Sequence, residues 1–509
     1  MARPGRLAVV SNVGGLLGAC ALLLLAACGG GGGASAATVP GGGGGGGTPG
    51  GGGGGGTPGG GGGGTTPPPV YRPTLLAADL RIDTDAAGAA ASIVPDVACD
   101  GNTVAVVWQD QRAGLPEVFY RTSLDGGVTW MLTDARLPRL PAGLVASTNP
   151  RVAVSGLAVY AVWQDNRNGA ADVFFNRSLD GGMTWLVPDV RLDTDVAGAA
   201  ASEAPRLALA GTNVYVVWQD ARNGARDIYL NRSADAGTTW LAADVRLDTN
   251  AAGVAGSHEP RIAASGAYVY VTWFDQRNGL PDVYANASAD SGATWLAADV
   301  RLDTDVAGSA ISLRPAVACD GANAYVVWED RRSGAGDVRC SRTTNGGATW
   351  SATDVRLDTD TAGAAASTVP VIQCTGTAVR VAWVDDRDGS TDIRFNRSAD
   401  GGGSWLASDV RVDGGTAGAA ASAGVVLAGN ATDVFVVWSD DRDGATDVLL
   451  AGSVDGGATF TTDVRLDNGD VAGAFASSAP AIANTGRRIF VAWTDARAGG
   501  DDIHLNTSP

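Results

Sequence analysis

The stretch SLDGGMTW (residues 178–185) recurs along the chain at a constant spacing. Related octapeptides begin at residues 123, 233, 288, 343, 398 and 453, and they read SLDGGVTW, SADAGTTW, SADSGATW, TTNGGATW, SADGGGSW and SVDGGATF. Consecutive copies therefore start 55 residues apart. A fixed period of this size indicates a repeat architecture, so the 509 residues are not a row of unrelated domains.

One full unit, residues 205–250, contains four short segments with the alternation of apolar and polar residues that is typical of β-strands. These segments are RLALA (206–210), NVYVVW (213–218), DIYLNRS (227–233) and DVRLD (244–248), and Gly-containing turns separate the first three. Four strands per unit in a long array predict an all-β fold, the β-propeller.

The octapeptide suits a tight turn between two strands. Its Asp carboxylate can accept hydrogen bonds from backbone N–H groups of the turn, and its Gly can adopt a positive φ. The closing Trp is a large apolar side chain that can fill the space between blades. The turn aspartates are Asp125, Asp180, Asp235, Asp290, Asp400 and Asp455.

The octapeptides resemble the Asp-boxes, S-x-D-x-G-x-T-W, of the sialidase-like (BNR-repeat) β-propellers, and the resemblance covers residues 71–509. It is highly specific for the fold and weakly specific for function. Sialidases of this family use three arginines to hold a sugar carboxylate, together with a Tyr–Glu pair and an Asp. Here YRPT at residue 71 matches the arginine motif poorly, and no Tyr–Glu pair is evident among four Glu, so we name no catalytic residue.

The other landmarks of the repeat occur eight times. The Trp that ends the second strand of each unit lies at 108, 163, 218, 273, 328, 383, 438 and 493. The last unit stops after its third strand, whereas an unassigned strand, ADLRIDTD, precedes the first unit at 78–85. We therefore expect a single eight-bladed propeller whose last blade is closed by the N-terminal strand, with two smaller rings as the alternative.

The N-terminal segment reads as a targeting signal. Residues 1–28 combine a basic start, a short apolar run and the box LAAC, which predicts a bacterial lipoprotein signal with lipidation at Cys28; an ordinary cleaved signal is the alternative. Residues 29–69 are a Gly/Thr/Pro-rich flexible linker, and residues 70–509 form the propeller. The prediction is a monomer at the bacterial outer membrane or cell surface, in contact with membrane through its lipid alone.

The composition is strongly acidic, with 50 Asp, 4 Glu, no Lys and a net charge of −18. Such a surface repels nucleic acid and anionic lipid. No cofactor is predicted, but calcium stays open because the DTD loops, such as Asp193 and Asp195, offer clustered oxygens. Whether Cys319 and Cys374, at equivalent positions of adjacent repeats, form a disulfide also stays open.

A binding site requires departures from the eightfold pattern. The Asp–Arg pair after each second strand does not depart from it, which favours a loop-ordering ion pair. Three adjacent units do depart: Arg151, Arg206 and Arg261 follow the Pro that opens the first strand, and His258 and Glu259 lie beside the third of them. Guanidinium groups bind carboxylate or sulfate in a bidentate manner, so these five residues are the predicted ligand site.

The near-uniform repeats favour a non-catalytic binding module for an anionic glycan or a protein partner. The alternatives are an exo-acting, sialidase-like glycoside hydrolase and a purely structural or assembly role. Whether the chain is an enzyme is left uncertain, although the lack of asymmetry favours a binding role.

Overall fold

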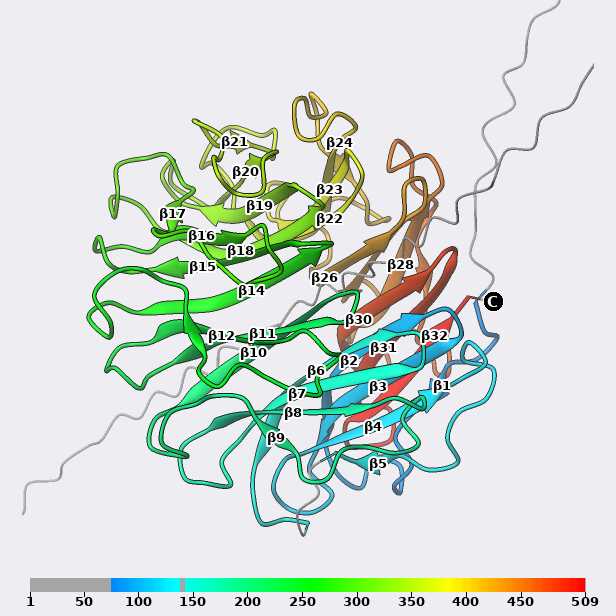
Figure 1. Cartoon of the computed structure of the whole chain (residues 1–509). Helices are drawn as coiled ribbons and strands as arrows, with labels where there is room; N and C mark the ends of the chain where they lie inside the picture. The colour runs from blue at the N-terminus through cyan, green and yellow to red at the C-terminus, as the bar shows by residue number, and fades with distance from the viewer. Residues whose placement is uncertain (1–74, 138–141, 509) are drawn as a thin grey trace, which may run out of the picture.

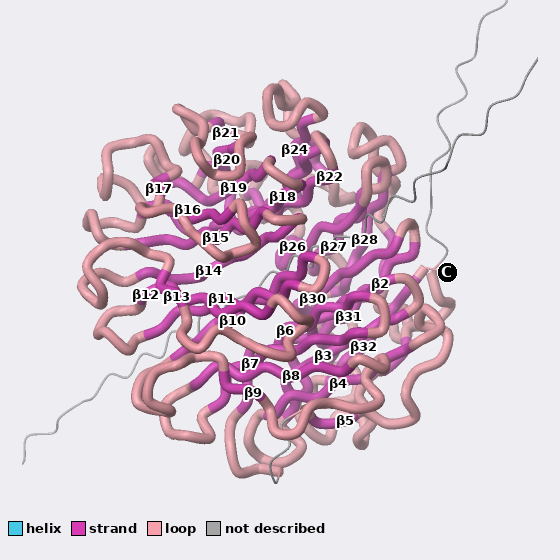
Figure 2. Tube along the Cα trace, in the orientation of Figure 1, coloured by secondary structure: helices cyan, strands magenta, loops and turns pink. Residues whose placement is uncertain are grey.

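The computed structural model describes residues 75–137 and 142–508. These residues form eight four-stranded antiparallel sheets arranged around a central axis (Figure 1). Strands and loops make up the whole of the described fold (Figure 2), and none of it is a helix that could span a membrane. The predicted eight-bladed β-propeller is therefore confirmed.

The strands fall into four layers from the axis outward. The innermost strands are β2 (Ser92–Asp100), β6 (Ser147–Ser155), β10 (Ser202–Ala210), β14 (Ser257–Ser265), β18 (Ser312–Asp320), β22 (Ser367–Thr375), β26 (Ser422–Gly429) and β30 (Ser477–Thr485). The second strands are β3 (Thr103–Asp110), β7 (Ala158–Asp165), β11 (Asn213–Asp220), β15 (Tyr268–Asp275), β19 (Asn323–Asp330), β23 (Ala378–Asp385), β27 (Val434–Asp440) and β31 (Arg488–Asp495). The third strands are β4 (Glu117–Ser123), β8 (Asp172–Ser178), β12 (Asp227–Ser233), β16 (Asp282–Ser288), β20 (Asp337–Thr343), β24 (Asp392–Ser398), β28 (Asp447–Ser453) and β32 (Asp502–Thr507). The outermost strands are β5 (Ala135–Arg136), β9 (Val190–Arg191), β13 (Val245–Arg246), β17 (Val300–Arg301), β21 (Val355–Arg356), β25 (Val410–Arg411), β29 (Val464–Arg465) and β1 (Leu80–Arg81).

Every innermost strand carries a β-bulge near its start. In β10 the register against β11 shifts between Glu203 and Arg206, and Ala204 within the bulge has φ 53°. The equivalent residue has a positive φ in all eight blades, including Val94 and Val369, whose branched side chains disfavour that conformation. The bulge fixes the direction of the residues that follow it, which include the three arginines of the predicted site.

The octapeptide forms the turn between the third and fourth strands. In blade 2 the Asp180 carboxylate accepts hydrogen bonds from Ser178 Oγ (2.6 Å), Thr184 N (2.8 Å) and Thr184 Oγ1 (2.6 Å). These bonds lower the pKa of Asp180 to about 2. Gly182 has φ 92°, and a Cβ there would lie 2.8 Å from the Thr122 side chain of the preceding blade, so the position requires glycine.

Apolar side chains from adjacent blades interlock between the sheets. The Trp of each second strand is fully buried, and the turn residue Trp185 packs edge-on against Tyr120 of the preceding blade at a centroid distance of 4.9 Å. Phe460 replaces Trp in the seventh turn and packs against Phe395 in the same way, at 5.0 Å. The predicted role of the closing aromatic residue between blades is therefore confirmed.

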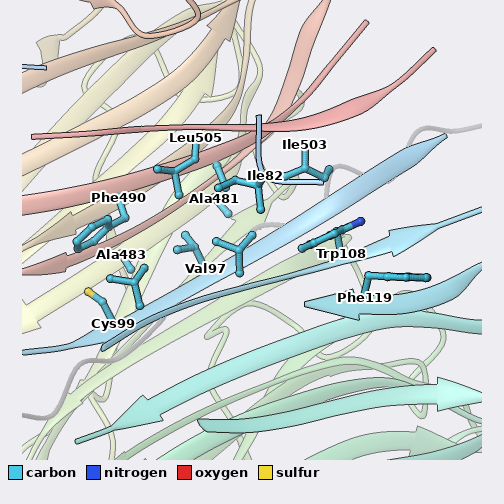
Figure 3. Close-up of a cluster of buried hydrophobic side chains, with 13 residues drawn as sticks. Ile82, Val97, Cys99, Trp108, Phe119, Ala481, Ala483, Phe490, Ile503 and Leu505 are labelled. Atoms are coloured by element: carbon cyan, nitrogen blue, oxygen red, sulfur yellow. The ribbon is translucent and has the colours of Figure 1, made fainter. Parts of the chain in front are cut away.

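The ring closes through the N-terminal strand. β1 pairs antiparallel with β32, with Leu80 opposite Leu505 and Arg81 opposite His504. Ile82 is buried in the cluster where the last and first blades meet (Figure 3), beside Ile503 and Leu505. The predicted closure of the last blade is therefore confirmed.

Several predictions fall outside the described residues. The signal segment with Cys28, the linker 29–69 and the first residues of the propeller region all precede residue 75. Cys319 and Cys374 lie within the described fold and are free thiols there, and burial raises the pKa of Cys374 to about 12.

We expect Ile82→Ala to lower the free energy of unfolding by about 2–5 kcal/mol, because it removes a fully buried side chain at the closure. Leu247→Ala, at the equivalent position of blade 3, is the matched control and should cost a similar amount. Chemical denaturation measures both. A change under about 0.5 kcal/mol for Ile82→Ala alone would mean that β1 does not hold the ring closed.

Candidate functional site

The Asp–Arg pair that follows each second strand is a repeated structural unit. In blade 3 the Asp220 carboxylate accepts from Trp218 Nε1 (3.0 Å), Arg222 N (2.9 Å) and the Arg222 guanidinium (2.8 and 2.6 Å). The same guanidinium also bonds to both oxygens of Asp244, at 2.9 and 2.8 Å. Burial alone would raise the pKa of Asp220, but the bonds from Arg222 outweigh it and lower the pKa.

The pair occurs in every blade, and its members are Asp110/Arg112, Asp165/Arg167, Asp220/Arg222, Asp275/Arg277, Asp330/Arg332, Asp385/Arg387, Asp440/Arg442 and Asp495/Arg497. In the last blade the second carboxylate comes from the N-terminal segment, where Asp79 bonds to Arg497 at 2.9 and 2.8 Å. A unit present in all blades orders loops and singles out no blade as a ligand site.

The DTD loops bring carboxylates together, but around an arginine. Arg191 lies 3.3 Å from Asp172, 2.6 Å from Asp193 and 2.5 Å from Asp195. Similar three-carboxylate groups occur around Arg81, Arg301 and Arg356. The guanidinium brings one positive charge to three carboxylates and so offsets part of their charge. Calcium binding stays a prediction.

Burial and carboxylate neighbours raise the pKa of one aspartate in each of these loops. Burial is the largest cause at Asp193, the charge of Asp172 adds to it, and together they raise its pKa to about 8 despite Arg191. Raised values of about 6 to 8 recur at Asp83, Asp193, Asp248, Asp303, Asp358, Asp413 and Asp467. These carboxyl groups therefore take up protons as the pH falls through about 8 to 6.

The three arginines of the predicted site lie just after the bulges of β6, β10 and β14. Arg151 and Arg206 are 1% and 6% exposed, and Arg261 is partly buried. In each, Nη1 donates to the carbonyl of the preceding proline, at 2.6, 2.8 and 3.1 Å. We call Arg151, Arg206 and Arg261 the axial arginine cluster, because the innermost strands that carry them contact one another in a ring around the axis.

The charges of the axial arginine cluster act on one another. Burial lowers the pKa of Arg206 well below its usual value, and the charges of Arg151 and Arg261 lower it further. Arg151 and Arg261 are two blades apart, yet the charge of Arg261 also contributes to lowering the pKa of Arg151, which burial brings to about 10. Charges on non-adjacent blades therefore act on one another in this region.

Asp96 occupies the equivalent position on β2 and is fully buried. Burial raises its pKa to about 6, whereas the charge of Arg151 and a hydrogen bond from Val152 N (2.9 Å) act in the opposite direction. Asp96 is therefore ionised at neutral pH, and it places one negative charge beside the three positive charges of the cluster.

His258 and Glu259 lie at the start of β14, at the end of the axis where the cluster lies. The His258 ring stacks on Phe274 at a centroid distance of 5.1 Å. Burial lowers its pKa, and the charge of Arg226 adds to the effect, so the imidazole is neutral at neutral pH. Glu259 is the bulge residue, with φ 52°, and its charge acts on Arg206. The structure thus brings all five predicted residues to one end of blades 2–4.

Sequence reasoning did not predict the ion pairs that surround this site. Glu203 accepts from Arg226 Nη2 at 2.7 Å, and in blade 5 Glu329 bonds to Arg314 and Arg331, both at 2.7 Å. With Glu259, three of the four Glu in the chain lie at this end of blades 3–5. The rarity of Glu in an Asp-rich chain was the signal that could have located them.

The tyrosines of the second strands are part of the core. Tyr160, Tyr215, Tyr270 and Tyr325 are all buried, as their repeated position before the strand Trp indicates. Burial raises the pKa of each phenol, to about 12 at Tyr325. A phenol with a raised pKa inside a blade interface is poorly suited to act as a nucleophile.

No protein-family model matches the chain, and no curated protein matches it either. Among solved structures, an ulvan lyase bound to -[GlcA(1-4)Rha3S]- is similar over 84% of this chain and 95% of its own, with 12% identity and a TM-score of 0.46. The polysaccharide lyase Uly1 (10% identity, 76% and 99% coverage, TM-score 0.47) and the phage phi92 endosialidase (11%, 84% and 68%, 0.38) are similar as well. At these identities and TM-scores the similarity carries no argument about activity.

We expect the protein to lose stability as the pH rises from about 5 to about 8. The loop aspartates have folded-state pKa values above the unfolded value of 3.8, so the stability that they contribute is lost as the pH rises through about 6 to 8. His258, with its lowered pKa, opposes this trend as a single group. Asp193→Asn should therefore stabilise the protein by at least about 1 kcal/mol at pH 8, and much less at pH 5.

The control is Asp180→Asn, because Asp180 is ionised throughout this range and its replacement should shift stability equally at both pH values. Thermal unfolding across the pH series measures the effect. Parallel pH profiles for wild type and Asp193→Asn would contradict the assignment of a raised pKa to this carboxyl.

Proposed function

We propose that this chain is a non-catalytic binding module that recognises an anionic group of a glycan or a protein partner at the end of the axis in blades 2–4. The observation that carries the proposal is the axial arginine cluster, in which three adjacent blades place guanidinium groups where other blades have Ala316, Val371 and Ala481. In a chain of net charge −18, this is a local concentration of positive charge that a carboxylate or sulfate can approach.

The five residues of the proposed site differ in their exposure to solvent. Arg261, His258 and Glu259 are partly exposed and can touch a ligand from solvent, whereas Arg151 and Arg206 lie behind them and supply the electrostatic field. The ion pair of Glu203 with Arg226 holds the adjoining loops in place. A rigid ring with fixed charges is preorganised, so binding requires little ordering of the protein.

The alternative is an exo-acting glycoside hydrolase, for which two suitably placed carboxyl groups are needed. Glu203, Glu259 and Glu329 are the candidates at this end, but Glu203 and Glu329 are held in ion pairs with arginine.

The binding proposal also includes a cellular location: a lipid at Cys28 and the 29–69 linker would hold the propeller at the bacterial cell surface.

The test is binding of the full chain to an array of acidic and neutral glycans, beside the variant Arg151→Val/Arg206→Ala/Arg261→Ala. We expect binding to acidic glycans that falls at least about tenfold in the variant, because a charge-assisted hydrogen bond contributes about 1.5–3 kcal/mol. Arg380→Leu, which replaces a buried arginine near the opposite end of its blade, should leave binding unchanged.

If neither the wild type nor any variant binds a glycan on the array, the glycan form of the proposal is contradicted and a protein partner is the form that is left. Equal binding by wild type and the triple variant would show that the arginines are not the site. Turnover of aryl glycosides by the wild type would instead support the hydrolase alternative.

A further inference from the structure

Four buried arginines have no carboxylate oxygen within 4.0 Å among the residues that the structure describes: Arg151, Arg177, Arg206 and Arg380. Two of them, Arg151 and Arg206, lie on adjacent innermost strands. Arginines with a carboxylate oxygen within this distance are otherwise common in the described fold, as Arg191 and Arg222 show. Among the described residues, Nε of Arg151 and of Arg206 has no acceptor, which is common in this fold, but Arg151 is the one arginine whose Nη2 is also buried without an acceptor. Buried cations are normally paired because an unpaired one costs several kcal/mol.

The carboxylate of Asp96, at the equivalent position of β2, does not bond to Arg151 or Arg206. Asp96 Oδ2 accepts from Val152 N at 2.9 Å, and Asp96 Oδ1 has no hydrogen-bond partner within residues 75–137 and 142–508. The charges of Glu259 and Asp96 offset part of the positive charge at Arg206. An excess of positive charge stays within a region that is almost closed to solvent.

Other arginines show that this arrangement is not general. Arg380 is equally buried and also lacks a carboxylate partner and an acceptor for its Nε, but its Nη1 donates to Gln373 Oε1 (2.8 Å) and its Nη2 to the Ala431 carbonyl (2.6 Å). The arginine of each Asp–Arg pair is surrounded by carboxylate oxygens, as Arg222 is. Arg151 donates one hydrogen bond, from Nη1 to the Pro150 carbonyl, and keeps two further donors pointing into the protein.

The fold does not require arginine at these positions. Ala316, Val371 and Ala481 occupy the same place in blades 5, 6 and 8, and they form the same strand pairing after the same bulge. The arginines therefore add charge to a strand that forms without them.

We propose that Arg151 and Arg206 hold a small inorganic anion on the axis of the propeller, flanked by Arg261 and Asp96. The anion completes the hydrogen bonding of the buried guanidinium donors and neutralises the excess charge. The low exposure of both arginines favours an ion of the size of chloride, phosphate or sulfate over a group attached to a chain. This inference shares Arg151 and Arg206 with the proposed function but holds whether or not a glycan binds. The proposed function also uses the more exposed Arg261, His258 and Glu259.

The experiment is thermal unfolding of the full chain in a chloride series at fixed ionic strength, with bulky gluconate replacing chloride. A ligand that binds the native state raises the melting temperature with its concentration, so we expect a saturable rise of at least about 2 °C with chloride. Parallel series with phosphate and sulfate determine whether a halide or an oxyanion is bound more tightly.

The double variant Arg151→Val/Arg206→Ala should show no dependence on the anion, because it removes both guanidinium groups. Ala and Val occupy the equivalent positions in blades 5 and 6, so we expect the variant to fold. Arg380→Leu is the matched control: it should melt at a lower temperature but keep the full dependence. Equal melting of the wild type in chloride, phosphate, sulfate and gluconate would overturn the proposal, and so would an unchanged dependence in the double variant.

If the double variant fails to fold, bromide soaked into crystals of the wild type provides the second measurement. An anomalous peak beside Arg151 and Arg206 supports the proposal, and it is overturned if neither bromide nor, in crystals soaked in sulfate, an oxyanion is found there. Glycan binding is read out separately: anion-dependent melting without glycan binding supports this inference alone, and glycan binding without anion dependence supports the proposed function alone.

Discussion

A ring of β-sheets is stable only when its last sheet joins its first, and this protein meets that constraint with a strand of two residues. β1 pairs with β32 and brings Asp79 to Arg497, so the last blade acquires both its fourth strand and its second carboxylate from the N-terminal side. Without that strand, β32 would be an exposed edge, and Ile82 would be missing from the packing between the last and first blades.

The fold and the site are specified by different residues. The Asp–Arg pairs, the buried Trp of each second strand and the octapeptide turns recur in all or nearly all blades and build a frame with eightfold regularity. The axial arginine cluster, Asp96 and the three Glu of blades 3–5 break that regularity on one part of the ring. Such asymmetry on a rigid frame is what a binding site requires.

Most of the fold could be predicted from the sequence. The 55-residue spacing gives the number of blades, and the strand at 78–85 lies outside the repeats and can be assigned to the last blade, which lacks its fourth strand. The depth of Arg151 and Arg206 could not, because exposure near the axis depends on side chains from non-adjacent blades. The partner of Glu203 was missed for a similar reason: Arg226 lies in a loop whose path the strand pattern leaves undefined.

The pairing of β1 with β32 also sets an order of events during folding. Residues 80 and 81 precede every other described strand, whereas their partners are residues 504 and 505, so this contact forms only after some 420 intervening residues are available. The other seven blades each contain four strands from one continuous segment and can form beforehand. Ring closure is thus the final step, and until then the incomplete blade exposes the edge through which two such chains could pair.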